Sequence, residues 1–429
     1  MSTLPSCFSA LLNTTLALFC LYLPQAMAKT SILTPETPAP LRFFTKGDAV
    51  FDLRHPDAPV FFRGMGYSPY RIGENPLKGA APKDDGRFSQ DLSMMKDMGV
   101  NYLHVFPRAM PTGFFQALDR EDLVYGQDIW LFPYIEDFLN PEYQEIQWKV
   151  IKEVIDHTYA VGRPDRLVLF SIGDELQAAS VTSTNKMHPD VTEFHGKHVV
   201  VTGRNASEVA MAKLMDRAMS YELETYGKRH LYCHTSWTHI GPITDRPDLE
   251  VQANDAILPD LGDLACLNIY TYANAVRSSG PGRSTGTSFQ GYLEQLAWEL
   301  QSKPIFITQV GLSTSPIAPK NWVPGFGGHS EEEVAKTFRQ IWQDLQKAQG
   351  RERFCGLAFF EWQDEWWKSG EDPRDAFRHE KEDPEEWFGL FELGPKNELI
   401  PKGNIPKTVQ AIFKNPQQMP TSSKSKGSK

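Results

Sequence analysis

The sequence predicts an α/β protein folded as a (β/α)8 TIM barrel. Short apolar runs of strand length alternate about eight times with amphipathic stretches of helical length. Consecutive apolar residues, such as Ile305, Phe306 and Ile307, are typical of parallel strands that are covered on both faces. No glycine-rich phosphate loop follows the first run, so a doubly wound open sheet is the weaker alternative.

The predicted elements follow one another along most of the chain. The strands are VFFRGMGYSPY, NYLHVF, DIWLFPYIE, RLVLFSIGDE, HLYCHTSW, LACLNIYTY, KPIFITQV and FCGLAFFEW. Helices are expected over FSQDLSMMKDMGV, near Phe114, and over PEYQEIQWKVIKEVIDHTYA, residues 207–226, GYLEQLAWELQ and SEEEVAKTFRQIWQDLQKA. In the last of these, Ser330 and Glu333 form a capping box, which predicts where that helix begins.

Composition limits the classes of function. The chain has 429 residues, of which 41% are hydrophobic and 23% charged, and this suits one large globular domain. A net charge of -10 without a basic cluster argues against nucleic acid or an anionic membrane surface as a partner. The 10 tryptophans can pack in a core, but flat rings also stack on the faces of sugars.

The N-terminus has the form of a secretory signal. An apolar stretch from Ala10 to Leu23 is followed by Ala26-Met27-Ala28, an A-x-A cleavage site. The stretch is shorter than a spanning helix needs, so a membrane anchor is the less favoured alternative. We therefore expect a secreted or periplasmic protein without stable membrane insertion after signal cleavage. Its expected segments are a signal peptide (1–28), an N-terminal extension (29–48), the barrel (49–415) and a disordered tail (416–429).

The cysteine count predicts no disulfide framework. Of 5 cysteines, Cys7 and Cys20 fall in the predicted signal peptide. Cys233, Cys266 and Cys355 remain, an odd number inside apolar runs, and are predicted to be buried as small hydrophobic residues.

Polar and aromatic side chains gather where the predicted strands end. In a (β/α)8 barrel, functional residues lie at the C-terminal ends of the strands. These ends carry, in order, Tyr67 and Tyr70, His104, Tyr134 and Glu136, Asp174 and Glu175, His234 and Trp237, Asn268 and Tyr270, Gln309, and Glu361, Trp362, Asp364 and Glu365. An oxocarbenium-like transition state needs an acid, a second carboxylate and hydrogen bonds to the sugar, so these residues predict a carbohydrate cleft.

Four of these segments resemble the clan A glycoside hydrolases, which are retaining (β/α)8 enzymes. LVLFSIGDEL resembles their fourth strand, LNIYTY their sixth strand and KPIFITQVG the strand that carries the nucleophile. FFEWQDEWWK resembles the last strand of β-glucan-active members, including glucanosyltransferase-like and family 2 barrels. The resemblance implies that Glu175 is the general acid/base, that Tyr270 bonds the nucleophile and that Trp362 forms the floor of a sugar subsite.

Two positions depart from the family pattern. Asp174 stands where the family usually has an asparagine that bonds the sugar 2-hydroxyl, and Gln309 stands where it has the nucleophile. An amide cannot form a glycosyl ester. Three hypotheses stay open: the chain is an engineered variant, it uses a last-strand acid instead (Glu361, Asp364 or Glu365), or it only binds glycans.

The sequence therefore predicts an exported retaining-type β-glycosidase or transglycosylase on a β-glucan-like poly- or oligosaccharide. The alternative is a catalytically silent glycan-binding protein on the same fold. The predicted catalytic positions are Glu175, Gln309 (at the nucleophile position) and Asp174. The predicted substrate contacts are Tyr67, His104, His234, Trp237, Tyr270, Glu361, Trp362, Asp364 and Glu365.

The prediction has a geometric form. The side-chain ends of Glu175 and Gln309 should lie about 5–5.5 Å apart across the barrel mouth. Trp362 and Trp237 should be partly exposed in the cleft. No cofactor is expected, and no metal, because the spacing of His188, His195 and His198 fits no familiar metal motif.

Overall fold

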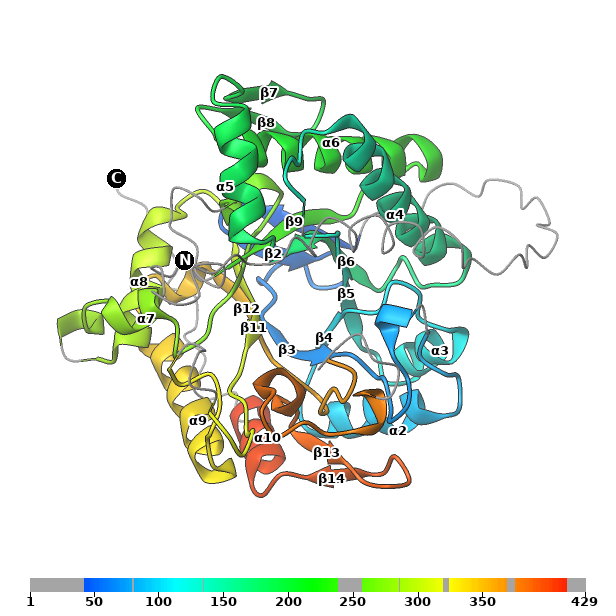
Figure 1. The fold of residues 1–429 in the computed structure, drawn as a ribbon, viewed down its shortest axis with the longest axis vertical. Coiled ribbons are helices and arrows are strands. Elements are labelled where there is room, and N and C mark those ends of the chain that lie inside the picture. The colour runs from blue at the N-terminus through cyan, green and yellow to red at the C-terminus, as the bar shows by residue number, and fades with distance from the viewer. Residues whose placement is uncertain are drawn as a thin grey trace, which may run out of the picture.

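Eight parallel strands close into a barrel that helices surround (Figure 1). The computed structural model describes residues 42–78, 81–133, 135–237, 257–284, 286–318, 324–368 and 375–414. The barrel strands are β3 (Phe62–Tyr67), β4 (Tyr102–Val105), β5 (Val124–Ile129), β6 (Leu167–Asp174), β9 (Leu231–Ser236), β10 (Ala265–Asn268), β11 (Ile305–Val310) and β12 (Phe354–Phe359). They stand in chain order, and β12 pairs with β3 to close the barrel. The predicted fold class is confirmed.

The α-helices lie outside the strands (Figure 1). They are α2 (Arg87–Asp97), α3 (Thr112–Arg120), α4 (Pro141–Ala160), α5 (Ala178–Met187), α6 (Ala206–Tyr226), α7 (Asn274–Ser278), α8 (Ser288–Glu299), α9 (Glu331–Lys347) and α10 (Ile405–Lys414). The predicted capping box is present at the start of α9, where Ser330 and Glu333 satisfy each other's backbone N–H groups. Between β9 and β10, the described residues hold only the 3-10 turn η4 (Pro259–Leu261).

Three hairpins and short turns complete the described fold. The hairpins are β1 (Phe43–Lys46) with β2 (Ala49–Asp52), β7 (Glu193–His195) with β8 (Val200–Thr202), and β13 (Phe391–Leu393) with β14 (Leu399–Pro401). The remaining 3-10 turns are η1 (Pro76–Lys78), η5 (Gly282–Ser284), η6 (Arg351–Arg353), η7 (Asp375–Phe377) and η8 (Pro384–Trp387). The β1–β2 hairpin crosses the expected boundary at residue 49. The expected signal peptide and C-terminal tail, and Tyr134, lie outside the described residues.

Side chains fill the barrel interior. The rings of Phe62, Tyr102 and Phe306 meet there, with centroids 4.9 to 5.6 Å apart. Phe43 of the β1–β2 hairpin packs on Phe62, and its centroid lies 5.9 Å away. Cys233, Cys266 and Cys355 are buried free thiols, as predicted. Because the interior is packed, chemistry in this fold falls to the ends of the strands.

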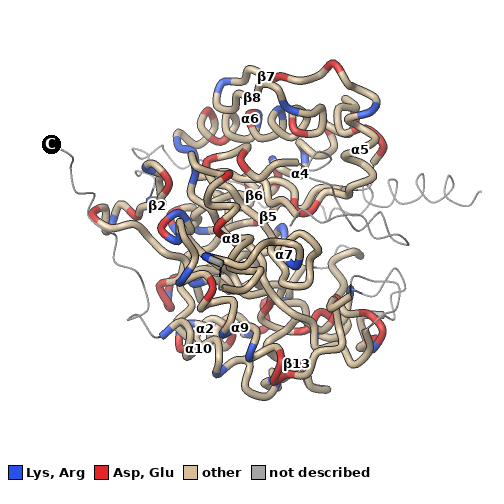
Figure 2. Tube along the Cα trace, turned by 90° about the vertical axis from the view of Figure 1, so that its left-hand side faces the viewer, with Lys and Arg blue, Asp and Glu red and all other residues tan. Residues whose placement is uncertain are grey.

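Positively and negatively charged side chains are mixed along the described chain and are not gathered on separate regions. Figure 2 shows Lys and Arg interleaved with Asp and Glu along the tube. Among the helices that the structure describes, none combines the length and the apolar character needed to cross a membrane.

Candidate active site

Two acids that follow each other in sequence share one hydrogen-bond donor at the end of β6. The Nδ2 atom of Asn268 donates to Asp174 Oδ1 and to Glu175 Oε1, each at 2.8 Å. Neighbouring residues of a regular strand point to opposite faces. Here the register between β6 and β9 shifts between Ser171 and Asp174, and φ is positive at Gly173 (72°) and Glu175 (48°). This irregularity turns both carboxyl groups to the same side.

The positive φ of Glu175 is unusual for a residue with a side chain. Such conformations cost about 1–3 kcal/mol and persist where the surrounding structure imposes them, often at functional sites. The backbone N–H of Glu175 donates to Thr235 O on β9 at 3.3 Å, which helps to hold this turn in place.

Gln309 joins the same network from β11. Its Nε2 donates to Asp174 Oδ2 at 2.8 Å, and its Oε1 accepts from the Tyr270 hydroxyl at 2.8 Å. The Thr308 hydroxyl donates to Asn268 Oδ1 at 2.9 Å, which assigns the two ends of the Asn268 amide. We call Asp174, Glu175, Asn268, Tyr270 and Gln309 the mouth network.

Burial changes the proton affinity of both acids. It raises the pKa of Glu175 to about 8; the charge of Asp174 adds to the rise and the Asn268 hydrogen bond opposes it. Burial also raises the pKa of Asp174 well above its usual range, with the charge of Asp128 as the next cause, and the hydrogen bonds from Asn268 and Gln309 oppose the rise. Asp174 accepts from two amides and Glu175 from one, so a negative charge is better stabilised on Asp174. Glu175 therefore holds the proton at neutral pH, as a general acid must.

Four of the predicted residues meet in this network: Asp174, Glu175, Tyr270 and Gln309. Trp237 lies close by; it is half-buried, and its Nε1 donates to Leu176 O at 2.8 Å. Asn268 is the member whose importance the sequence did not reveal. It stood in the row of strand ends, but no pattern showed that one amide would bind two acids.

The prediction that Trp362 is partly exposed in the cleft is wrong. Its side chain is completely buried and packs on Phe391, with ring centroids 4.6 Å apart. Phe360 is the ring of this segment that lies towards the mouth network, because it contacts Phe388, which in turn contacts Tyr270. The two aromatic residues are two positions apart, and the sequence does not show which of them faces the core.

Tyr67, His104, His234 and Asp364 are buried and lie outside the mouth network, so their contact with a substrate stays a prediction. The Tyr67 hydroxyl donates to Asp91 Oδ2 at 2.9 Å, and His104 Nδ1 lies 3.1 Å from the Tyr102 hydroxyl. His234 Nδ1 lies 3.0 Å from Ile172 O. A strand end presents side chains both inward and outward, and these residues point into packed regions.

The acids after β12 and two lysines near them form a second group. We call this group the last-strand cluster; it consists of Glu361, Asp364, Glu365, Lys368 and Lys402. Lys402 Nζ lies 2.5 Å from Asp364 Oδ1, and Lys368 Nζ lies 3.5 Å from Glu365 Oε2. Glu361 and Glu365 are buried, and their predicted substrate contacts stay predictions. The charge of Lys368 lowers the pKa values of Asp174 and Glu175, so this lysine of the last-strand cluster also acts on the mouth network.

No group of three or more histidine, cysteine or acidic side chains in the described chain could hold a metal ion. In the segment considered above, His188 Nε2 lies 3.0 Å from Asp137 Oδ1 and His195 Nε2 lies 3.5 Å from Glu193 Oε2.

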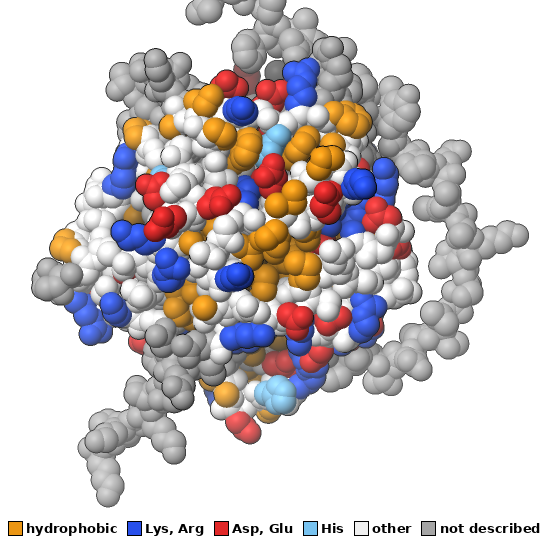
Figure 3. All heavy atoms as spheres, turned by 90° about the horizontal axis from the view of Figure 1, so that it is seen from below, with side chains coloured by type: hydrophobic (Ala, Val, Ile, Leu, Met, Phe, Trp, Pro, Cys, Tyr) orange, Lys and Arg blue, Asp and Glu red, His pale blue; other side chains and the backbone are white. Residues whose placement is uncertain are grey.

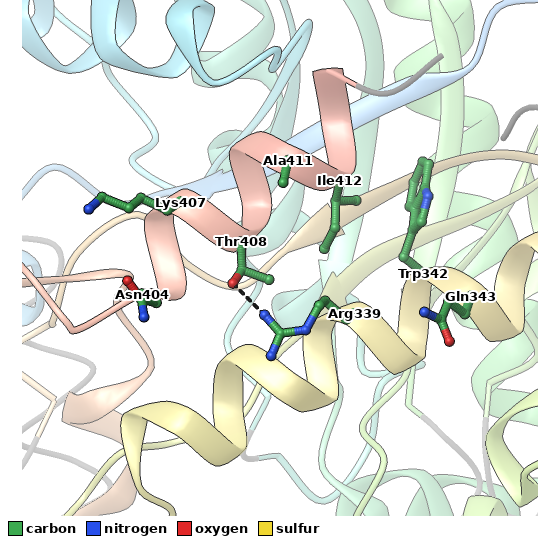
Figure 4. Close-up of a pocket in the computed structure, with 8 residues that line it drawn as sticks. All are labelled: Arg339, Trp342, Gln343, Asn404, Lys407, Thr408, Ala411 and Ile412. Atoms are coloured by element: carbon green, nitrogen blue, oxygen red, sulfur yellow. Dashed lines mark hydrogen bonds between the residues drawn. The ribbon is translucent and has the colours of Figure 1, made fainter. Parts of the chain in front are cut away.

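A surface hollow of about 370 Å³ lies elsewhere, between α9 and α10 (Figure 4). Its lining, which includes Arg339, Trp342 and Lys407, contains no carboxyl group, and Arg339 donates to Thr408 across it. Figure 3 shows the face seen from below, where hydrophobic side chains gather near the centre among charges of both signs. The hollow lacks the acids that sugar chemistry needs, so the mouth network is the candidate site.

Comparison with known proteins supports the fold. No protein-family model matches the sequence, and no curated protein matches it. Solved structures do match. A family 2 β-galacturonidase from Eisenbergiella tayi, bound to galacturonate, has a TM-score of 0.51 at 14% identity; the match covers 87% of this chain and 54% of that one.

Two further structures match to a similar degree. A β-glucuronidase from Bifidobacterium dentium has a TM-score of 0.52 at 13% identity, over 86% of this chain and 48% of that one. Saccharomyces cerevisiae Gas2p, a glutamate-to-glutamine mutant in complex with laminaritetraose and laminaripentaose, has a TM-score of 0.50 at 15% identity, over 87% and 67%. The chain spans about half the length of the first two. The resemblance to the clan A barrels is confirmed as a likeness of fold.

Proposed function

We propose that this chain acts on β-linked glycans at the mouth network, as a retaining-type β-glycosidase or transglycosylase. The observation that carries the proposal is Glu175, a carboxyl group whose pKa is raised to about 8 beside a second acid. A carboxyl group that keeps its proton at neutral pH can protonate the leaving oxygen of a glycoside.

Asp174 is the second carboxylate of this proposal. Gln309 occupies the position expected of a nucleophile but has no carboxylate, and both ends of its amide are hydrogen-bonded. Two of the last-strand acids are less suited, since Asp364 is paired with Lys402 and Glu365 with Lys368. Asp174 precedes Glu175 in the chain and belongs to the same network, and its two carboxylate oxygens accept from the neutral amides of Asn268 and Gln309.

The substrate class rests on the residues and on the neighbours. The solved structures with the same fold carry galacturonate, a coumarin glucuronide or laminari-oligosaccharides, all of them sugars or glycosides. The substrate class proposed for this chain is a β-linked glycan. We also propose export by a signal peptide, because a protein that acts on extracellular glycans must itself be exported.

A catalytically silent glycan-binding protein is the second candidate. Gln309 favours it, because glutamine keeps the size and hydrogen bonds of glutamate without its charge. The two candidates differ in whether Glu175 transfers its proton.

Glu175→Gln separates the two candidates. The full chain and this variant are offered a panel of β-linked oligosaccharides; product release is measured by chromatography and binding by calorimetry. We expect turnover to fall about 10²- to 10⁴-fold while binding persists. Glu193→Gln, at an exposed acid on β7, is the matched control. Turnover unchanged in Glu175→Gln would place the acid elsewhere, and binding without turnover in the unaltered chain would establish the silent candidate.

A further inference from the structure

The mouth network lacks an attacking group on the side that faces Glu175. Gln309 cannot form an ester, and its Nε2 and Oε1 are engaged by Asp174 and Tyr270. Displacement at the anomeric carbon with a covalent intermediate requires attack on the face opposite the leaving oxygen, which Glu175 protonates. Among the described residues of the mouth network, Asp174 is the one remaining carboxyl group that could attack, and the alternative is a group of the substrate.

Asp174 is held by a hydrogen bond on each carboxylate oxygen: Oδ1 accepts from Asn268 and Oδ2 from Gln309, each at 2.8 Å, so neither oxygen is free to attack. Asp174 is adjacent to Glu175 on one strand end, and both carboxyl groups bind the same Asn268 nitrogen at 2.8 Å. Their bonded oxygens lie no further apart than twice that length and approach the mouth from the same side. An acid and a nucleophile that act on opposite faces of a sugar ring need to approach from different sides.

We infer that the substrate supplies the nucleophile, and that the site takes a β-glycoside whose cleaved sugar carries an acetamido group at C2. This inference rests on the proposed function, since it assumes that Glu175 is the acid. The carbonyl oxygen of a 2-acetamido group can reach C1 of its own ring, and some glycosidase families use such substrate assistance.

The residues of the mouth network fit the parts of that group. Both oxygens of Asp174 accept from amide N–H groups in this structure, so Asp174 suits the acetamido N–H, whose nitrogen gains positive charge as the carbonyl oxygen attacks. The Tyr270 hydroxyl, which donates to Gln309 Oε1 in this structure, can donate to the acetamido oxygen instead.

An aromatic wall beside Tyr270 suits the acetamido methyl group. The ring of Tyr270 lies 5.2 Å from that of Tyr272 and 5.9 Å from that of Phe388, between centroids. Phe326 packs on both Tyr272 and Phe388. Tyr270, Tyr272 and Phe326 are half-buried, so part of each ring is open to a ligand.

The reaction needs no reagent other than the substrate and water or an acceptor sugar. The acetamido oxygen bonds to C1 as the bond from C1 to the leaving oxygen breaks, and Glu175 gives its proton to that oxygen. Asp174 holds the N–H of the cyclic oxazolinium ion. Water then gives a proton to Glu175, and its oxygen bonds to C1. The bond from C1 to the acetamido oxygen breaks, so the oxazolinium ring opens and the product keeps the β configuration at C1. A sugar hydroxyl in place of water gives transfer.

The test compares aryl 2-acetamido-2-deoxy-β-glycosides with the corresponding aryl β-glycosides, in gluco and galacto forms, on the full chain. We expect kcat/KM to be at least about 10²-fold higher for an acetamido substrate. Replacing its acetyl hydrogens by fluorine should lower the rate progressively, since fluorine weakens the carbonyl nucleophile. Because this series uses the unaltered chain, its result cannot be explained by a substitution that disturbs folding.

Asp174→Asn is the matching variant, with folding checked by circular dichroism. We expect its kcat/KM for the acetamido substrate to fall about 10²-fold or more and its sensitivity to fluorine to change. Equal or faster turnover of the plain β-glycosides, or rates that fluorine does not alter, would overturn the inference and leave the proposed function standing. Absence of turnover for every acetamido substrate also overturns it; if β-glycan binding is absent too, the proposed function fails with it.

Discussion

The mouth network and the last-strand cluster both bury carboxyl groups at the same end of the barrel, yet their partners differ. Burial raises the pKa of Glu175 to about 8 and that of Asp364 to about 7. Glu175 and Asp174 accept from neutral amides, whereas Asp364 faces the ammonium group of Lys402. Protonation of an ion-paired carboxyl leaves a buried cation without its partner. An acid bound by amides can exchange its proton without that cost, so the first group suits catalysis and the second suits structure.

The largest effect is expected from Lys402→Met. It leaves Asp364 buried without its cation, so the free energy of unfolding should fall by about 3–5 kcal/mol in urea denaturation. Lys402→Met combined with Asp364→Asn should recover part of the loss, because no buried charge then lacks a partner. Full stability of Lys402→Met would show that the last-strand cluster is not a structural ion pair.

Two tryptophans give the next comparison. Trp362→Ala opens the core and should lower the free energy of unfolding by about 3–5 kcal/mol. Trp237→Ala, at a half-buried ring near the mouth network, should leave stability closer to that of the unaltered chain. It should weaken oligosaccharide binding by about 1–3 kcal/mol, measured by calorimetry. Affinity lost in Trp362→Ala, with stability unchanged, would reverse these assignments.

An exchange of acid and amide tests why Gln309 is tolerated. Gln309→Glu alone places two carboxyl groups in the contact that Gln309 and Asp174 now make at 2.8 Å, and the second charge should raise their pKa values. Gln309→Glu with Asp174→Asn restores one carboxylate and one amide, with the ends exchanged. We expect the double variant to hydrolyse plain β-glucosides at least about 10²-fold faster than the unaltered chain. Equal rates in the unaltered chain and both variants would show that position 309 does not face the anomeric carbon.

The smallest effect concerns pH. The charges around Glu175 are Asp174 and Glu385, which raise its pKa, and Lys368, which lowers it. Activity should fall about tenfold per pH unit above about 8, as Glu175 loses its proton. The raised pKa also contributes stability that is full below about 4.5 and is lost as pH rises through about 8. Glu175→Gln should remove this dependence, and an unchanged alkaline limb of the stability curve in that variant would contradict the assignment.

The sequence by itself determined the barrel and part of the site. Apolar runs such as Ile305 to Ile307 and amphipathic helices with caps such as Ser330 are local patterns, and each is decided by residues close together in the chain. The adjacency of Asp174 and Glu175 and the amide at position 309 could likewise be read directly.

Only the tertiary structure decided which strand-end residues meet. A register shift turns Asp174 and Glu175 to one side, and Asn268, some ninety residues later, bonds both. Trp362 faces the core although Phe360, two residues earlier, lies towards the mouth network. The direction of a side chain at a strand end depends on irregular backbone and on partners that are distant in sequence, and local patterns carry no record of either.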